Sequence, residues 1–210
     1  GALGQTGVDG GDNAHFRAPR DVAVDQEGNV YVTDEGNHRI QVFDSARNYL
    51  RTIGIGGECG SDYAHLCFPI DATVDRDGHI FVADNYGSRV QVFDRAGIYL
   101  TTIGGSVGSS TGQLREAGGL AIDSAGNLYI AEYANHRIQK FAPGVPGWVQ
   151  TNINGFGNPN VRGIKLNTLR DMLYASTSAW DGSGARRLLR STDGKMWHEV
   201  IGSAFGTAYN

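Results

Sequence analysis

The sequence lacks three features that would each point to a class of protein. No apolar run approaches the roughly 20 residues that a membrane-spanning helix needs, so we expect no membrane span. The 18 Lys and Arg residues are outnumbered by 22 Asp and Glu residues and form no basic stripe, which argues against a nucleic acid partner. No Gly-x-Ser-x-Gly elbow, His-Glu-x-x-His helix or phosphate-binding loop is present. Without these motifs we favour a non-catalytic protein and keep an enzyme as the alternative.

Cysteine is also scarce, with two residues in the whole chain. Cys59 and Cys67 lie eight positions apart in one glycine-rich loop, GGECGSDYAHLCFP. We predict that they form a disulfide, which would place the protein in an oxidising compartment, either extracellular or periplasmic. The alternative is a pair of reduced thiols. A metal site is a weaker alternative, because two cysteines supply only half of a zinc shell.

Glycine, by contrast, is abundant, with 31 of 210 residues, which predicts many tight turns between short strands. The chain also repeats itself. A shift of 50 positions superimposes Pro19 on Pro69, Gly28 on Gly78, Asp34 on Asp84, Arg39 on Arg89 and Phe43 on Phe93. A further shift of 48 superimposes Gly78 on Gly126, Asp84 on Glu132, Arg89 on Arg137 and Phe93 on Phe141. A period of this length indicates a structural unit stacked on copies of itself.

Within each copy, apolar and polar residues alternate, as in DVAVD, NVYVTD and RIQVFD, which is typical of half-buried strands. The first turn of each copy needs a residue with positive φ, and the candidates are Gly28, Gly78 and Gly126. For the second turn we expect the same role from Gly36, Asn37 or Asn135. Each copy is then a four-stranded antiparallel meander of propeller-blade size. We predict an all-β fold, a β-propeller with about four blades in this chain.

The string PRDVAVDQEGNVYVTDEGNHRIQVFD at 19–44 resembles the NHL repeat, named for an Asn-His-Leu or Asn-His-Arg signature. The resemblance extends over three consecutive copies, residues 15–141. The middle copy departs from the signature with Gly87-Ser88-Arg89. The resemblance implies a β-propeller, most often of six blades.

The fourth unit lacks the NHL signature. STDGKMW at 191–197 resembles the Asp-box hairpin of sialidase-type propellers, which implies structural roles for Asp193 and Trp197. We divide the chain into an inter-blade loop or the end of a preceding blade at 1–18, blades at 19–54, 55–104 and 105–154 with their loops, and a diverged blade with a trailing loop at 155–210. Four blades are fewer than six. The chain is therefore part of a larger propeller, or its open edges are covered by a partner or by a second copy.

The repeated polar residues of the second turn allow two interpretations. The chemical one makes His38 and His136 bases or ligands. We favour the structural one, in which an acidic residue and an arginine pair across the hairpin beside a turn-forming asparagine. A motif that recurs in every blade does not converge on one active site. The residues to which we assign structural roles are Asp34, Asn37, Arg39, Asp84, Arg89, Asn135 and Arg137.

Two other pairs could hold a metal: Asp12 with His15, and Asp62 with His65. The stretch HLCFPIDATVD at 65–75 also resembles the peptidyl-amidoglycolate lyase domain, an NHL-type propeller with zinc ligands. That family places a His directly after the proline that opens the first strand. The three corresponding positions here are Arg20, Ile70 and Gly118, so the lyase mechanism does not carry over. We predict no cofactor and keep a divalent ion at these two pairs as the alternative.

The remaining candidates are polar and aromatic residues in the loops expected at one rim of the propeller. They are Glu35, Asn85, Tyr86, Tyr133, Trp180 and Asp181. Aromatic rings beside a few polar groups suit a binding surface for a protein or a glycan. We predict a non-catalytic scaffold that presents loops for such a partner. The alternatives are an extracellular assembly subunit, a homo-oligomer that shares blade edges, and a metal-dependent enzyme of lyase or lactonase type.

Overall fold

The computed structural model describes residues 2–144, 147–151, 160–167, 172–178, 186–191 and 198–199. Within this part of the chain, the helical structure is limited to the 3-10 turn η1 (Glu35–Asn37). No helix among these residues is long and apolar enough to cross a membrane. The chain divides into two compact units, Gly1–Ala117 and Gly118–Asn210.

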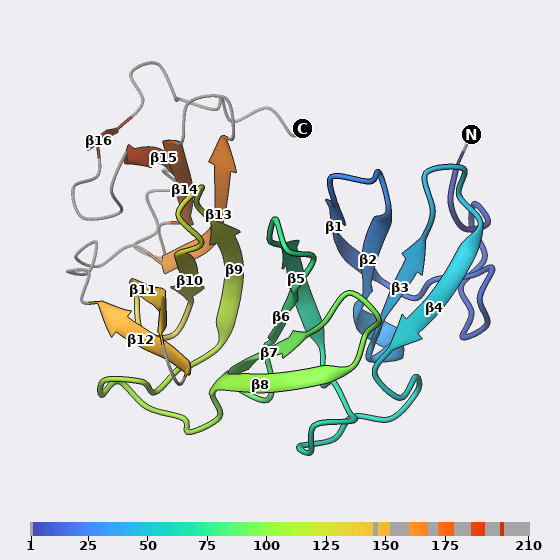
Figure 1. Cartoon of the computed structure of the whole chain (residues 1–210), viewed down its shortest axis with the longest axis horizontal. Helices are drawn as coiled ribbons and strands as arrows, with labels where there is room; N and C mark the ends of the chain where they lie inside the picture. Colours follow the sequence, from blue (N-terminus) through green and yellow to red (C-terminus); the bar gives the residue numbers. More distant parts are fainter. Residues whose placement is uncertain are drawn as a thin grey trace. The chain divides into compact units, whose positions relative to one another are not determined.

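The first unit contains two sheets, each of four antiparallel strands in chain order (Figure 1). Blade 1 consists of β1 (Pro19–Val24), β2 (Val30–Asp34), β3 (Arg39–Phe43) and β4 (Tyr49–Ile53). Blade 2 consists of β5 (Pro69–Val74), β6 (Ile80–Asp84), β7 (Arg89–Phe93) and β8 (Tyr99–Gly104).

The second unit contains two more sheets with the same strand order. Blade 3 consists of β9 (Ala117–Ile122), β10 (Leu128–Glu132), β11 (Arg137–Gly144) and β12 (Gly147–Thr151). Blade 4 consists of β13 (Asn160–Asn167), β14 (Met172–Ser178), β15 (Arg186–Ser191) and β16 (His198–Glu199). The all-β fold and the four-stranded blades predicted from the sequence are confirmed.

The first turn of each NHL-like copy is built as predicted. Gly28, Gly78 and Gly126 have φ values of 85°, 85° and 80°, in the left-handed region that glycine adopts without steric strain.

The second turn corrects our expectation, because the residue with positive φ in blade 1 is His38, at 54°, and neither Gly36 nor Asn37. Asn37 has another task, since its Nδ2 donates to the carbonyl of Gly10 at 2.7 Å. Gly36 is required for space: a Cβ there would lie 2.6 Å from the side chain of Arg17. In blade 3 the residue with positive φ is likewise His136 and not Asn135.

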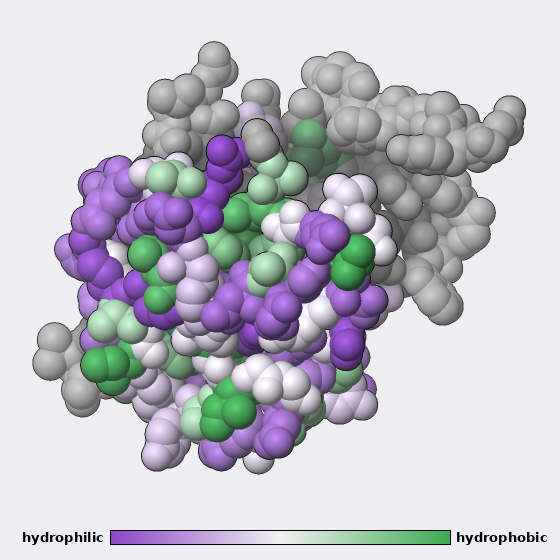
Figure 2. Space-filling model, turned by 90° about the vertical axis from the view of Figure 1, so that its right-hand side faces the viewer, coloured by the Kyte–Doolittle hydropathy of each residue, from purple (hydrophilic) through white to green (hydrophobic). Residues whose placement is uncertain are grey.

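The core of the first unit lies between its two blades, where β5 packs against β1 and β2. Its buried residues are Tyr31, Ile40, Val42, Ile53, Leu66, Ala72, Ile80, Val82 and Phe93. Figure 2 views the molecule from the side on which β4 lies in Figure 1; apolar side chains, in green, form separate groups among polar ones on this face.

The core of the second unit is built in the same way, with β13 packed against β10 and β11. Its buried residues are Ala121, Tyr129, Ala131, Ile138, Leu173 and Ala175. In both units, therefore, the second strand of one blade packs against the first strand of the next.

Candidate functional site

A buried polar network closes the second turn of blade 1. The fully buried Asp34 accepts a hydrogen bond from Arg39 Nε at 2.7 Å. The Arg39 guanidinium also donates to the main-chain carbonyls of Gly11 and Asp12, both at 2.6 Å. Gln41 Nε2 donates to Asp34 Oδ2 at 3.3 Å. The ion pair therefore fastens the N-terminal loop to the blade.

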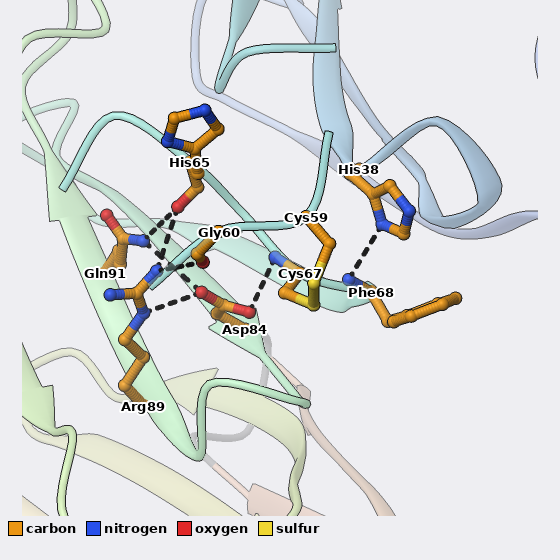
Figure 3. The surroundings of a disulfide bond; sticks show 9 residues. All are labelled: His38, Cys59, Gly60, His65, Cys67, Phe68, Asp84, Arg89 and Gln91. Atoms are coloured by element: carbon orange, nitrogen blue, oxygen red, sulfur yellow. Dashed lines mark hydrogen bonds and ion pairs between the residues drawn. A yellow bond between two sulfur atoms is a disulfide. The ribbon is translucent and has the colours of Figure 1, made fainter. Parts of the chain in front are cut away.

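Blade 2 repeats the network (Figure 3). Arg89 Nε donates to Asp84 Oδ2 at 2.7 Å, and both side chains are buried. Arg89 Nη2 and Gln91 Nε2 donate to the carbonyl of His65 at 2.9 and 2.7 Å. Asp84 Oδ1 accepts the N–H of Cys67 at 2.9 Å. The network thus fixes both ends of the short segment between His65 and the first strand.

Blade 3 achieves the same arrangement with a longer acid. Glu132 Oε1 accepts from Arg137 Nε and from Gln139 Nε2, both at 2.5 Å. Its other oxygen, Oε2, accepts from Asn135 Nδ2 at 2.6 Å. In blades 1 and 2 the arginine joins the acid to carbonyls of the preceding loop, and in blade 3 the acid joins the arginine, the glutamine and the turn asparagine of the same blade.

The Asp-His pairs proposed for metal binding each lie within one inter-blade loop. His15 Nδ1 is 2.6 Å from Asp12 Oδ1, and its Nε2 is 2.9 Å from Gln5 Oε1. His65 Nδ1 is 2.7 Å from Asp62 Oδ1. The side-chain hydrogen bond from the histidine is the main cause that lowers the pKa of Asp12, and likewise that of Asp62. Each pair closes its own loop, and the two pairs belong to loops that precede different blades.

Among the described residues, the group of three with metal-ligand spacing is Asp75, Asp77 and His79, in the first turn of blade 2. Their ligand atoms lie within 4.8 Å of one another. Asp75 Oδ1 accepts the N–H groups of Asp77 and His79 at 2.9 and 2.8 Å, and Asp75 Oδ2 is 2.8 Å from His79 Nδ1.

The corresponding turns show what this group does. In blade 1, Asp25 Oδ2 accepts from Asn29 Nδ2 at 2.8 Å and from the Tyr31 hydroxyl at 3.1 Å. Burial raises the pKa of Asp25, but the hydrogen bonds from Asn29 and Tyr31 outweigh it and the net pKa is lowered. Burial, and next the bond to Asp25, raise the pKa of Tyr31 to about 12. In blade 3, Asn127 bonds Asp123 in the same way, at 2.7 Å. His79 therefore stands where two other blades have a turn-closing asparagine.

Replacing His79 with asparagine is expected to change the free energy of unfolding by less than about 0.5 kcal/mol, because the bond to Asp75 is kept. Thermal unfolding with and without added zinc measures this. If zinc raised the midpoint of the wild type but not that of His79→Asn, the three residues would be a metal site and this interpretation would be wrong.

Three aromatic rings contact one another where the second turns of blades 1 and 2 adjoin the loop that precedes β5. The rings of His38 and Phe68 meet edge to face with centroids 4.5 Å apart, and those of Phe68 and Tyr86 lie 5.7 Å apart. The exposed fractions of Phe68 and Tyr86 are 38% and 76%. We call His38, Phe68 and Tyr86 the aromatic platform.

The platform stands on a closely bonded backbone. The N–H of Phe68 donates to His38 Nδ1 at 3.2 Å, which Figure 3 shows beside the disulfide between Cys59 and Cys67. The N–H of Tyr86 donates to the carbonyl of Cys67 at 3.2 Å. The predicted disulfide is thus present and adjoins the residue that carries the central ring.

The comparisons with known proteins concern both the sequence and the fold. The NHL repeat matches residues 16–43, 66–93 and 114–141, one segment in each of the first three blades. The chain contains three NHL repeats. A search of the curated proteins found no match.

Solved structures show the same fold at low sequence identity. A chain of the nidogen/laminin complex matches at 16% identity with a TM-score of 0.67, over 90% of this chain and 66% of that one. A gluconolactonase from Xanthomonas campestris matches at 17% identity with a TM-score of 0.62, over 86% of this chain and 61% of that one. A catalytically inactive virginiamycin B lyase from Staphylococcus aureus, solved with quinupristin, matches at 15% identity with a TM-score of 0.61. The match covers 87% of this chain and 55% of that one. The NHL-repeat chain thus spans between about half and two thirds of these structures, which include both a binding complex and enzymes.

The rim residues predicted from the sequence differ in their burial and in their contacts. Tyr86 belongs to the platform. Glu35 is half-buried, with its Oε2 3.4 Å from Arg20 Nε, and Asn85 Nδ2 donates to the carbonyl of Ala117 at 3.2 Å. Tyr133 is half-buried. The remaining predicted residues lie outside the described part of the chain: Trp180, Asp181, Asp193 and Trp197.

Sequence reasoning missed Phe68. The residue has φ of 54°, and the residues at the same position in the other two NHL repeats, Ala18 and Glu116, have 47° and 52°. Blade geometry therefore imposes this conformation whatever the side chain. The blade explains the backbone conformation of Phe68, but not why a large, exposed ring occupies a position with a conformation that bulky residues avoid.

Proposed function

We propose that this NHL-repeat chain is a non-catalytic scaffold that binds another protein through the aromatic platform. The observation that supports the proposal is the exposed pair Phe68 and Tyr86, held on a backbone fixed by hydrogen bonds and a disulfide. Large rings on rigid supports give contact area with little loss of conformational entropy on binding. They are also the residue types that dominate the binding energy of protein interfaces.

The polar residues of the repeats support the same view. The buried carboxylates of Asp34, Asp84 and Glu132 are each hydrogen-bonded to an arginine and a glutamine of their own blade. A general base needs a carboxylate that can reach a substrate. These three carboxylates are buried and hydrogen-bonded within their blades, and the exposed aromatic platform is the binding surface that we propose.

The disulfide also bears on location. Such bonds persist in oxidising environments, so we infer that the protein acts outside the cytosol, in an extracellular or periplasmic space. In that compartment the exposed platform is accessible to a protein or a glycan partner.

Panning a random peptide library on the immobilised chain tests the proposal. Peptides enriched on the wild type are expected to bind the Phe68→Ala, Tyr86→Ala double variant at least tenfold more weakly, a loss of about 1.4 kcal/mol. The matched control is Tyr63→Ala, which removes another exposed tyrosine, 66% exposed, outside the platform. A glycan array probed with the same three proteins provides the other arm. Glycan binding that the double variant loses would move the proposal from proteins to sugars, and binding that it keeps would refute the platform.

A further inference from the structure

The aromatic platform contains a hydrogen bond that requires a neutral histidine. The N–H of Phe68 donates to His38 Nδ1 at 3.2 Å, and Figure 3 shows this bond between the two residues. A backbone amide can only donate, so His38 Nδ1 must offer a lone pair and the ring must carry its proton on Nε2. A protonated ring has a hydrogen on both nitrogens, and it cannot accept this bond.

Three other histidines have the opposite environment. Their Nδ1 atoms lie 2.6, 2.7 and 2.8 Å from a carboxylate oxygen, in the pairs His15 with Asp12, His65 with Asp62 and His79 with Asp75. A carboxylate beside the ring is compatible with protonation, because the added charge turns the contact into an ion pair. Acid therefore preserves these three contacts and breaks the one made by His38.

The charged groups around the turn that carries His38 are paired with one another. Glu35 Oε2 lies 3.4 Å from Arg20 Nε, and Arg17 Nε donates to Asp9 Oδ2 at 3.2 Å. The turn therefore directs its own acidic side chain to an arginine.

The two elements that pack against His38 also have their charges engaged elsewhere. In the loop before β5, Glu58 and Asp62 lie 3.8 and 2.7 Å from ring nitrogens of His65. At the second turn of blade 2, Asp84 is buried and paired with Arg89. Among the described residues His38 forms no ion pair, so protonation of its ring gains no counter-ion that would offset the loss of the bond.

Blade 2 shows the same contact without a titratable acceptor. Ser88 occupies the position of His38, and its Oγ accepts the N–H of Glu116, the counterpart of Phe68, at 3.5 Å. A hydroxyl can accept this bond at neutral and at acidic pH. The blade therefore needs an acceptor at this position, and blade 1 has one that acid removes.

We propose that protonation of His38 opens the aromatic platform, so that its partner binds at neutral pH and is released on acidification. The hydrogen on Nδ1 would point at the N–H of Phe68, and two donors repel each other. Phe68 carries the central ring, in contact with both His38 and Tyr86, so a displaced His38 removes one ring and loosens the next. Histidine changes its charge between about pH 5 and 8. Release of a partner rests on the proposed function, whereas the proton-dependent bond does not.

Nuclear magnetic resonance of the whole chain tests the bond without a partner, in a titration from about pH 7.5 to pH 5. At neutral pH the ring nitrogen signals of His38 are expected to show the proton on Nε2. The amide signals of Phe68 and Tyr86 are expected to move as the His38 ring is protonated, while the amides of β2 show that the blade stays folded. In His38→Ser, which copies blade 2, these two amides are expected to stay in place.

The matched control is His136→Ser, the same substitution at the same position of blade 3. His136 Nδ1 accepts no hydrogen bond from the described residues, so this variant is expected to titrate at Phe68 as the wild type does. A proton on Nδ1 at neutral pH, or a Phe68 amide that does not respond while the His38 ring is protonated, would overturn the proposal.

Partner release is measured with peptides from the panning experiment that contain no His, Asp or Glu. The wild type and His136→Ser are expected to bind them about fivefold more weakly at the acidic end of the range, the loss of one hydrogen bond. His38→Ser lacks one ring and binds more weakly throughout, but its affinity is expected to be the same at both pH values. Equal affinities of the wild type at both pH values, or the same loss in His38→Ser, would refute acid release. If no peptide binds at all, the proposed function fails, and the titration of the Phe68 amide alone decides whether the platform opens.

Discussion

The Asp34→Ala variant is expected to lose about 3–5 kcal/mol of its free energy of unfolding, the usual result of removing one partner from a buried ion pair. Arg39 would keep its bonds to the carbonyls of Gly11 and Asp12, but its charge would stay buried with no counter-ion. Urea unfolding at neutral pH measures the loss.

Two further variants decide whether the network is responsible. Asp44→Ala removes an exposed turn carboxylate that bonds Asn48, and its effect is expected to be much smaller. The Asp34→Ala, Arg39→Met double variant removes both charges and is expected to recover part of the lost stability, because an apolar pair carries no desolvation penalty. If Asp34→Ala were no worse than Asp44→Ala, the ion pair would not be what fastens the loop.

The second large effect concerns the disulfide. Replacing Cys59 and Cys67 together with alanine is expected to lower the free energy of unfolding by about 2–3 kcal/mol, mainly because the unfolded chain loses a closed loop. The two cysteines are separated by eight positions, so the loop is short and the effect is at the lower end of the usual range. Unfolding of the wild type with and without a reductant should give the same difference, and a reductant should leave the double variant unchanged.

The local effect of this change tests the support of the aromatic platform. The carbonyl of Cys67 accepts the N–H of Tyr86, and the carbonyl of Phe68 accepts the N–H of Asn85. Without the disulfide, hydrogen exchange at these two amides is expected to become faster, while the amides of β2 keep their protection. Unchanged exchange at Tyr86 and Asn85 would show that the backbone bonds hold the platform unaided.

Much of the fold could be predicted from the sequence because it is written in local patterns. Alternation in DVAVD or RIQVFD reports half-buried strands, and an acid five positions before an arginine spans one hairpin, which is why the pairing of Asp34 with Arg39 was anticipated. Repetition made these patterns easier to recognise, since each of them recurs at the same offset in three blades.

The rest depended on contacts between blades, which no local pattern records. The residue before a proline normally adopts an extended conformation, so the sequence alone gives Phe68 the wrong backbone and hides its position beside His38 of another blade. His38 itself takes the left-handed conformation, as do Ser88 and His136 at the same position of the other two NHL repeats, so the position in the blade and not the residue type sets it. The exposure of Val22 and Val24 could not be predicted either, because an apolar strand has the same sequence pattern whether or not a neighbouring element covers it.

The way in which Arg39 and Arg89 hold the inter-blade loops has a consequence for how the protein can change. Both side chains donate hydrogen bonds to main-chain carbonyls. Arg39 bonds those of Gly11 and Asp12 in one loop, and Arg89 bonds those of Gly60 and His65 in the other. A backbone oxygen is the same in every residue type. The exposed side chains of these loops, other than the Asp-His pairs that close them, can therefore be changed without breaking the bonds to the arginines. A new binding specificity could be introduced in this way on the same blades.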